Sequence, residues 1–312
     1  MRNIYTILRL LRLPNLIIIA GVLYLQRFCI VHPLLQTVGI NPGWAGYGLI
    51  VLGTVLIAAA GYLINDYFDI GIDAVNTPAK AAVLKSIPHY SIKKSYFVLA
   101  LTGLAIIALA CILTGAFLLW FVYLIATLVL FWYSSRLKKV LILGNIAIAM
   151  ASAFTMPAAW LFDWLVLSGQ YSMNPEVSGI YYSISLRVII YSLFAFLISF
   201  AREIIKDTED MEGDSRFGCR SIPVIFGAAV AKRTIVACFA LTLIMLCVWQ
   251  VYSLNVDRSG LTLYLAIAVD LPLLWLITMV FRMHTKTEYH QAGQMSKVIM
   301  VTGILSMLFF LF

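Results

Sequence analysis

Residues 44–73 read WAGYGLIVLGTVLIAAAGYLINDYFDIGID, and this stretch decides the fold. Its first part, 44–64, carries no charged residue and is long enough to cross a bilayer as a helix, which takes about 20 residues. Its second part places carboxylates at Asp66, Asp69 and Asp73, and this i, i+3, i+7 spacing puts them on one face of a helix. The stretch therefore predicts a membrane helix followed by a cluster of acidic side chains.

A second acidic cluster with the same spacing follows a later apolar run. Residues 206–214 read KDTEDMEGD and place carboxylates at Asp207, Asp210 and Asp214. Exposed carboxylates are common at helix ends, so one such cluster would be weak evidence for a site. Two clusters with matched spacing favour a site, because crowded carboxylates beside a membrane repel one another and lose hydration unless a cation joins them.

The cation that best fits these side chains is Mg²⁺, a hard ion that takes oxygen ligands and bridges phosphate groups. The amide of Asn65 adds an oxygen ligand directly before the first cluster. We therefore predict a magnesium cofactor. Its predicted ligands are Asn65, Asp66, Asp69, Asp73, Asp207, Asp210 and Asp214.

The composition is that of a polytopic membrane protein. Of the 312 residues, 62% are hydrophobic and only 12% are charged, and the mean hydropathy is +0.97, whereas soluble proteins are nearer half apolar and a quarter charged. The predicted spans are 13–32, 44–64, 96–113, 116–133, 141–162, 180–204, 223–251, 261–281 and 295–312. We predict an all-α fold with these nine helices around a central cavity and the two clusters on pseudo-related halves of one domain, 1–312.

Two short segments refine this topology. Thr114-Gly115 predicts a tight hairpin between the third and fourth spans, and residues 80–95 predict a short amphipathic helix along the membrane interface. Each acidic cluster is expected to begin a cytoplasmic loop, over roughly 65–95 and 205–222.

The basic residues indicate the orientation. If the N-terminus is cytoplasmic, all 22 Lys and Arg residues except Arg27, Arg187 and Arg258 fall on cytoplasmic segments, as the positive-inside rule requires. Both acidic clusters then lie on the cytoplasmic side of the cell membrane. The formal net charge of +8 is explained by this topology and by contact with anionic lipid headgroups, so nucleic acid is not an expected partner.

Two basic segments lie where a phosphate-bearing substrate would approach. Residues 133–139 read YSSRLKK and close the fourth span. Such a segment alone is an ordinary basic flank, but opposite two acidic clusters we interpret Tyr133 and Lys138 as phosphate-binding. Arg12 and Asn15, at the entrance of the first span, are interpreted in the same context as a substrate-binding edge.

These features suit a diphosphate substrate at the membrane surface. A metal-bound diphosphate is a good leaving group, because the charge that develops on it is already stabilised. An allylic carbon attached to such a group ionises to a carbocation, which apolar and aromatic surroundings shelter from water.

At these motifs the chain resembles the UbiA-type intramembrane prenyltransferase superfamily. Residues 65–73 match its first aspartate motif, 210–214 match its second, and 133–138 match its YSxxLK element. The resemblance implies Mg²⁺-dependent transfer of a prenyl group from a prenyl diphosphate, geranylgeranyl or similar, to a hydrophobic acceptor. The catalytic residues expected on this basis are Asp66, Asp69, Asp210 and Lys138. The expected diphosphate contacts are Tyr133, Lys138, Lys80 and Lys206.

Within the superfamily, the stretch REIIKDTEDMEGD at 202–214 resembles the branch that O-alkylates geranylgeranylglyceryl phosphate to digeranylgeranylglyceryl phosphate. An aromatic acceptor, such as 4-hydroxybenzoate or another quinone precursor, remains the alternative. The chain departs from the usual pattern after Asp73, where many members have Asn-Arg-Pro and a further Arg-Pro pair but residues 76–83 read NTPAKAAV. Lys80 or Lys85 is expected to supply the missing charge.

A transporter that relays ions through intramembrane carboxylates is the alternative from another class. Transport acids usually lie near the membrane midplane on broken helices, whereas the two clusters are expected at the cytoplasmic edge. The main acids inside the spans are Asp163, which we interpret as a helix end, and Asp270, which we expect to face a polar partner.

Overall fold

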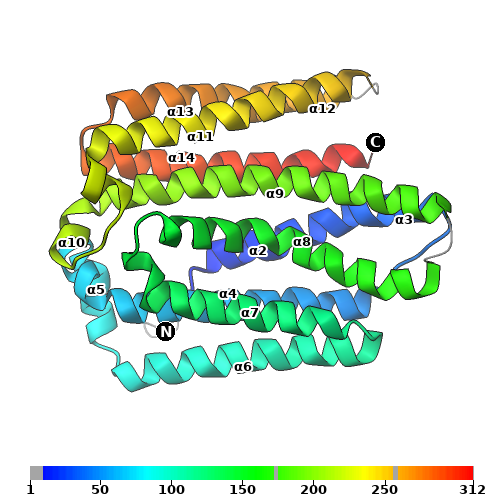
Figure 1. The fold of residues 1–312 in the computed structure, drawn as a ribbon, viewed down its shortest axis with the longest axis horizontal. Coiled ribbons are helices and arrows are strands. Elements are labelled where there is room, and N and C mark those ends of the chain that lie inside the picture. The colour runs from blue at the N-terminus through cyan, green and yellow to red at the C-terminus, as the bar shows by residue number, and fades with distance from the viewer. Residues whose placement is uncertain (1–9, 172–174, 256–258, 312) are drawn as a thin grey trace. The chain divides into compact units, whose positions relative to one another are not determined.

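The computed structural model describes residues 10–171, 175–255 and 259–311, and within these residues it contains helices and no strands. Nine segments in this part of the chain are long and apolar enough to cross a membrane (Figure 1). They are Leu13–Gln36, Trp44–Asn76, His89–Thr114, Phe117–Ser135, Leu143–Ser168, Pro175–Glu209, Ile222–Leu254, Ser259–Arg282 and Lys286–Phe310. The predicted all-α membrane fold is therefore confirmed.

Several spans combine more than one helical element. The first consists of α2 (Leu13–Leu25), the π-helix η1 (Gln26–Val31) and α3 (His32–Gln36), and the eighth of α12 (Ser259–Leu265), the π-helix η3 (Ala266–Asp270) and α13 (Leu271–Arg282). The remaining elements are α4 (Trp44–Asn76), α5 (Pro78–Lys85), α6 (His89–Thr114), α7 (Phe117–Ser135), η2 (Leu137–Lys139), α8 (Leu143–Tyr171), α9 (Pro175–Glu209), α10 (Met211–Arg216), α11 (Ile222–Asn255), α14 (Lys286–Leu305) and η4 (Ser306–Phe310).

The structure corrects the predicted extent of the segment after the second span. Helix α4 does not end near residue 64 but continues to Asn76. No proline interrupts residues 65–76, and the next proline along the chain, Pro78, comes directly after the helix has ended. The expected interfacial helix at 80–95 is instead the shorter α5, which begins at Pro78, and α6 starts directly after Pro88. The first acidic cluster therefore lies on a membrane helix and not in a loop.

The predicted hairpin after the third span is confirmed. Helix α6 ends at Thr114 and α7 begins at Phe117. Gly115 adopts φ 78, a left-handed conformation that a residue without Cβ tolerates at a helix C-terminus.

The chain forms two compact units. Unit 1 comprises Met1–Leu137 and Phe154–Ile189, and unit 2 comprises Lys138–Ala153 and Ile190–Phe312. Each unit thus carries one acidic cluster. That the halves are related, and that a central cavity lies between helices, remain predictions.

Unit 1 is held together by close packing of α4 against α6. A Cβ atom added at Gly53 would lie 3.0 Å from the carbonyl oxygen of Gly103, and one added at Gly103 would lie 3.1 Å from that of Gly53. Small residues let membrane helices approach closely, since lipid provides no hydrophobic force between helices. Buried Ile50, Ile57 and Ile107 extend this contact into a core.

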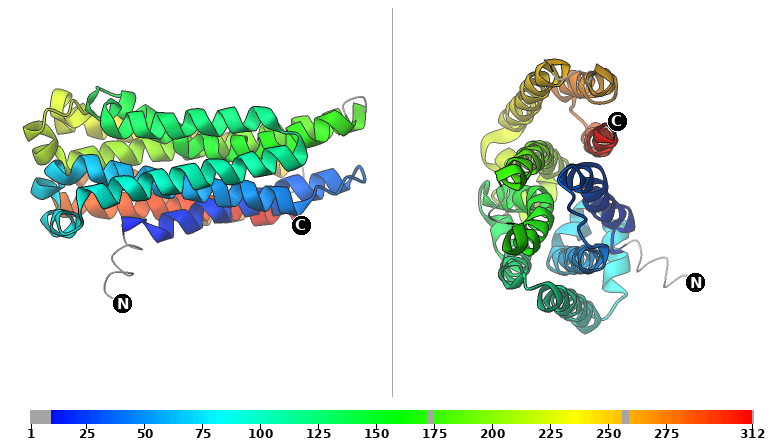
Figure 2. Two further views of the ribbon diagram at one scale, coloured as in Figure 1. Left: turned by 90° about the horizontal axis from the view of Figure 1, so that it is seen from below. Right: turned by 90° about the vertical axis from the view of Figure 1, so that its right-hand side faces the viewer.

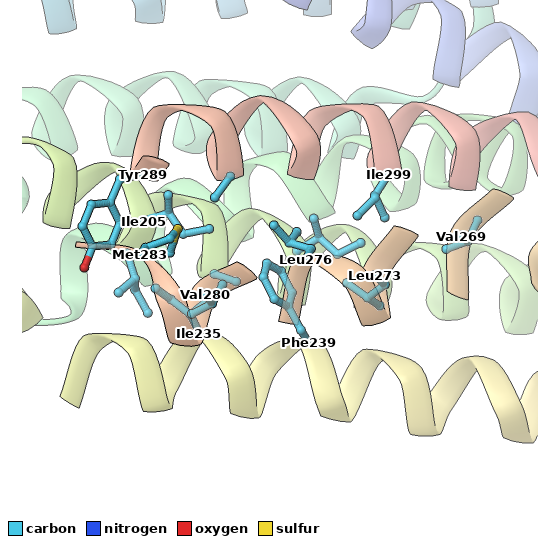
Figure 3. Close-up of a cluster of buried hydrophobic side chains, with 14 of the residues drawn as sticks. Ile205, Ile235, Phe239, Val269, Leu273, Leu276, Val280, Met283, Tyr289 and Ile299 are labelled. Carbon is cyan, nitrogen blue, oxygen red and sulfur yellow. The ribbon is translucent and has the colours of Figure 1, made fainter. Parts of the chain in front are cut away.

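Unit 2 has a separate core between α9, α11, α13 and α14, drawn in Figure 3. Ile205 of α9, Phe239 of α11 and Leu276 of α13 are buried there, with Ile299 of α14. Figure 2 shows α11, α13 and α14 end-on as neighbouring helices. Gly227 has φ 82 and kinks α11 one turn from its start.

Unit 1 also contains an ion pair buried within the membrane helices. Arg27 of η1 donates from Nη1 to Asp163 Oδ1 at 2.7 Å and from Nη2 to the carbonyl oxygen of Gly43 at 2.7 Å. Its guanidinium carbon also lies 4.1 Å from the ring centroid of Tyr47. Asp163 is 2% exposed and lies inside α8, so its interpretation as a helix end was wrong. A buried arginine supplied by another helix compensates the carboxylate.

Asp270 has the polar partner that was expected for it. It ends the π-helix η3 in unit 2 and accepts a hydrogen bond of 2.6 Å from Gln250 Nε2 on α11. This amide–carboxylate contact links two helices of the same core.

Candidate active site

The first acidic cluster occupies the last turns of α4. Asp66 is 1% exposed and Asp69 is 3% exposed, while the Asp73 side chain is 14% exposed. All three lie on one continuous helix, so the predicted helical face is confirmed. Buried carboxylates of this kind require compensation by cations or by hydrogen-bond donors.

Two protein cations reach this cluster from outside α4. Arg12 Nη2 lies 3.0 Å from Asp66 Oδ1, and Lys80 Nζ lies 2.7 Å from Asp66 Oδ1 and 2.7 Å from Asp73 Oδ2. Arg12 precedes α2 in a left-handed conformation, with φ 53, and its guanidinium carbon lies 4.9 Å from the ring centroid of Tyr62. The structure thus brings together Arg12 and Lys80, two basic residues to which the sequence assigned substrate contacts.

Lys80 reaches the carboxylates because the chain reverses after α4. Thr77 has φ −140 and ψ 71, which ends the helix, and Pro78 opens α5 at a position where its missing N–H costs nothing. The Thr77 amide donates to the Asp73 carbonyl oxygen at 2.8 Å, and its hydroxyl donates to Asp73 Oδ1 at 3.2 Å. The NTPAK segment thus places an ammonium group against the cluster.

Asn65 is also placed in the first cluster, where it contacts another member. Its Nδ2 donates to Asp69 Oδ2 at 2.8 Å, from one turn earlier on the same helix. This contact orients the Asp69 carboxylate. Because the amide nitrogen of Asn65 is the donor, its Oδ1 is the atom that could bind a metal ion.

The second cluster has a different backbone. Asp207 lies in the last turn of α9, Asp210 lies between the helices with φ −96 and ψ 5, and Asp214 is buried in α10. A continuous helical face was expected here, and the break at Asp210 corrects it. The backbone still forms i→i−4 hydrogen bonds across the break, from Asp210 N to Lys206 O at 2.9 Å and from Asp214 N to Asp210 O at 3.1 Å.

Sequence reasoning missed one residue of the second cluster. Asn145 of α8 donates from Nδ2 to Asp207 Oδ2 at 2.7 Å. The two residues are 62 positions apart, and nothing in a local motif connects them. Only the packing of α8 against α9 in unit 2 reveals the contact.

The other acidic residues near the second cluster have partners of their own. Glu209 lies 3.1 Å from His290, and Glu212 lies 2.6 Å from Arg216. Glu203 lies 3.0 Å from the adjacent Arg202.

The remaining predicted site residues lie at or beside the ends of their own helices. Tyr133 is half-buried in the last turn of α7 in unit 1, and Lys138 is half-buried in η2 at the start of unit 2. Lys206 is half-buried on α9, and Asn15 is half-buried in the first turn of α2. Their roles toward substrate remain predictions.

The donor set fits a magnesium ion that is shared with a substrate. Among the described residues, no group of three or more His, Cys, Asp or Glu side chains forms a cage for a metal ion by itself. Mg²⁺ is commonly held by one or two carboxylates together with substrate phosphates. Asp66 Oδ2 is buried and has no hydrogen-bond partner in the described part of the chain, so this oxygen is available as a ligand.

In the part of the chain that the structure describes, nine apolar segments and two aspartate clusters define an intramembrane enzyme of the aspartate-rich prenyltransferase class. The chain belongs to the UbiA prenyltransferase family, whose model matches residues 28–300.

Known relatives agree with this assignment. The chain is 30% identical over 201 residues to a digeranylgeranylglyceryl phosphate synthase of Hyperthermus butylicus, a match that covers 64% of this chain and 62% of that protein. It is 28% identical over 290 residues to the synthase of the same name from Korarchaeum cryptofilum, covering 89% of this chain and 92% of that protein.

Solved structures share the fold. A structure described for digeranylgeranylglyceryl phosphate synthase in membranes superposes with a TM-score of 0.63 at 21% identity, over 99% of both chains. A UbiA homologue from Archaeoglobus fulgidus, bound to GPP and Mg²⁺, superposes with a TM-score of 0.55 at 18% identity, over 97% of this chain and 99% of that one.

Proposed function

We propose that the protein transfers a geranylgeranyl group from its diphosphate to geranylgeranylglyceryl phosphate, forming an ether bond within the membrane. The observation that carries this proposal is the first cluster. Three carboxylates and two basic side chains meet at the end of a membrane helix, where a diphosphate headgroup would lie while its prenyl chain enters the apolar region.

The aspartates of both clusters are proposed to hold Mg²⁺ together with the diphosphate. The ligands are Asn65, Asp66, Asp69, Asp73, Asp207, Asp210 and Asp214. When bound, Mg²⁺ neutralises negative charge on the diphosphate and improves it as a leaving group. A UbiA homologue with this fold binds GPP and Mg²⁺, which supports the assignment.

Basic and hydroxyl side chains complete the diphosphate contacts. Lys80 and Arg12 already contact the first cluster, so a short movement of either brings it to a phosphate oxygen. Tyr133, Lys138 and Lys206 are proposed to contact the diphosphate, and Asn15 to line the substrate edge. Preorganised cations of this kind stabilise the charge that develops as the C–O bond breaks.

The reaction is an alkylation of oxygen. The bond between C1 of the prenyl group and the diphosphate oxygen breaks, and its electron pair leaves with the diphosphate. The acceptor's hydroxyl oxygen forms the new bond to C1 and loses its proton. Buried aliphatic and aromatic side chains of the spans keep water from competing for the allylic cation.

The acceptor is assigned from relatives and from the second motif. The relatives from Hyperthermus butylicus and Korarchaeum cryptofilum are digeranylgeranylglyceryl phosphate synthases, and residues 202–214 resemble that branch. We also propose that the N-terminus and both clusters lie on the cytoplasmic side, since the basic residues are concentrated on that side.

Purified protein incubated with labelled geranylgeranyl diphosphate, Mg²⁺ and a panel of acceptors tests the proposal. We expect an acid-stable ether product with geranylgeranylglyceryl phosphate, and its loss when Mg²⁺ is chelated. A product formed only with phenolic acceptors would show that the acceptor class is wrong. The absence of any prenylated product, from protein that still binds the diphosphate, would reject the enzymatic reading altogether.

A further inference from the structure

In each acidic cluster, the side-chain amide of an asparagine donates a hydrogen bond to one aspartate. In unit 1, the amide of Asn65 donates to Asp69 Oδ2 at 2.8 Å, and in unit 2 the amide of Asn145 donates to Asp207 Oδ2 at 2.7 Å. In the first case the donor lies one turn away on the same helix, and in the second it comes from another helix.

The surroundings of Asn145 are those of a fixed side chain. Asn145 is 7% exposed and lies in the first turn of α8. Just before this turn, Ile142 adopts φ 64, a left-handed conformation that is costly for a β-branched residue. Strained backbone of this kind persists where the surrounding structure requires it and is enriched at functional sites. The strained residue at the start of α8 and the burial of Asn145 both favour a defined position for this side chain.

We propose that Asn145 is a positioning residue of the second aspartate cluster, which fixes the Asp207 carboxylate so that its other oxygen serves as a metal ligand. This inference rests on the proposed function, because it concerns the Mg²⁺ that would accompany a diphosphate. A hydrogen bond to one carboxylate oxygen fixes the orientation of the whole group, and therefore the direction in which its other oxygen can bind a metal ion. Such supporting hydrogen bonds commonly affect metal affinity.

The chemistry of the donor is as important as its position. An amide donates a hydrogen bond without a formal charge, so it orients the Asp207 carboxylate without adding a positive charge that would compete with a cation. A lysine or arginine in the same place would orient the carboxylate but would also neutralise it. An aspartate would add a like charge at hydrogen-bonding distance.

The test measures Mg²⁺ binding by calorimetry in the presence of geranylgeranyl thiodiphosphate, an unreactive analogue, and so does not depend on turnover. For Asn145→Ala we expect about tenfold weaker Mg²⁺ binding, with the melting temperature within a few degrees of wild type. Asn145→Asp preserves the shape of the side chain and should weaken Mg²⁺ binding further, because two carboxylates then face each other.

The chain offers a matched control in the same unit. Gln250 donates to Asp270 Oδ2 at 2.6 Å, which is also an amide–carboxylate bond between two helices of unit 2. Gln250→Ala removes that bond, so it should affect the melting temperature and leave Mg²⁺ binding unchanged.

A second variant keeps the test decisive if Asn145→Ala fails to fold. Asn145→Ser keeps a polar side chain at this position but is too short to reach Asp207, which itself stays unchanged, so we expect a melting temperature near wild type with about tenfold weaker Mg²⁺ binding. Mg²⁺ binding within twofold of wild type in N145A, or in N145S if N145A does not fold, overturns the proposal. Failure of prenyl transfer by the wild-type protein contradicts only the proposed function, because the Mg²⁺ measurement does not depend on it.

Discussion

The two acidic clusters have the same spacing in the sequence but different surroundings in the structure. In the first cluster, three carboxylates lie on one unbroken helix, and Arg12 and Lys80 form ion pairs with two of them, so the protein itself supplies two positive charges. In the second, the helix breaks at Asp210, and the partner of Asp207 is the neutral amide of Asn145. The spacing thus determines where carboxylates are placed but not what compensates their charge.

This difference has consequences for substrate binding. Lys80 is shared between Asp66 and Asp73, so the first cluster brings a basic group as well as ligands to an incoming diphosphate. Asp207 is oriented by a donor that carries no charge. The first cluster is therefore expected to be more sensitive to loss of a carboxylate, in stability as well as in activity.

The largest expected effect is that of Asp66→Asn. Prenyl transfer should fall by roughly 10³-fold, because one change removes a metal ligand and the acceptor shared by two cations. The protein should also lose about 2 kcal/mol of stability, less than for a fully buried pair, because the Arg12 and Lys80 side chains are each 32% exposed. Initial rates and melting temperatures in detergent measure both quantities.

Asp207→Asn is the counterpart in the second cluster. It should also abolish most activity, but it should cost only about 1 kcal/mol of stability, since a single hydrogen bond to a neutral amide is weakened. Equal losses of stability in the two variants would show that the clusters do not differ in charge compensation.

The next largest effect concerns the ion pair of unit 1 that lies outside the clusters. Arg27→Met leaves Asp163 buried without its arginine, so we expect a loss of about 3 kcal/mol of stability. Mg²⁺ binding should be unchanged, because Arg27 lies in the middle of the first span, away from the end at which Arg12 contacts the first cluster. Thermal unfolding and calorimetry separate the two quantities. A double variant, Arg27→Met with Asp163→Leu, should recover much of the stability, and its failure to do so would assign the loss to packing.

A smaller effect is expected for Lys80→Met. The change removes a cation from between two aspartates, so the KM for the prenyl diphosphate should rise about tenfold. Lys85→Met is the control, because Lys85 is exposed on the same short helix α5. If both variants raise the KM equally, the cause is the loss of one positive charge from α5, and not the loss of the contacts between Lys80 and the two aspartates.

The sequence predicts those parts of this site that depend on local spacing. Asp66, Asp69 and Asp73 lie on one helical face as predicted, because each position is determined by the turns of α4. The pairs Asn145–Asp207 and Arg27–Asp163 join residues that are 62 and 136 positions apart. These contacts depend on how the helices pack, so no local sequence motif predicts them. The end of α4 was missed for another reason: the limit of an apolar run shows where lipid contact ends, whereas a helix ends where its backbone is interrupted, here before Pro78.

The smallest expected effect distinguishes the acids within the second motif. Glu212 lies between Asp210 and Asp214 in sequence, but its side chain is 73% exposed, and its Oε1 lies 2.6 Å from Nη2 of Arg216, one turn later in α10. An exposed i, i+4 pair contributes about 0.3 kcal/mol, so Glu212→Gln should leave melting temperature, Mg²⁺ binding and prenyl transfer close to wild type. Asp214→Asn, which changes a buried carboxylate two residues later, should abolish most transfer. A loss of Mg²⁺ binding in Glu212→Gln would mean that the metal site extends onto the exposed face of α10, and the comparison between the two clusters would then have to include a fourth acidic side chain in the second.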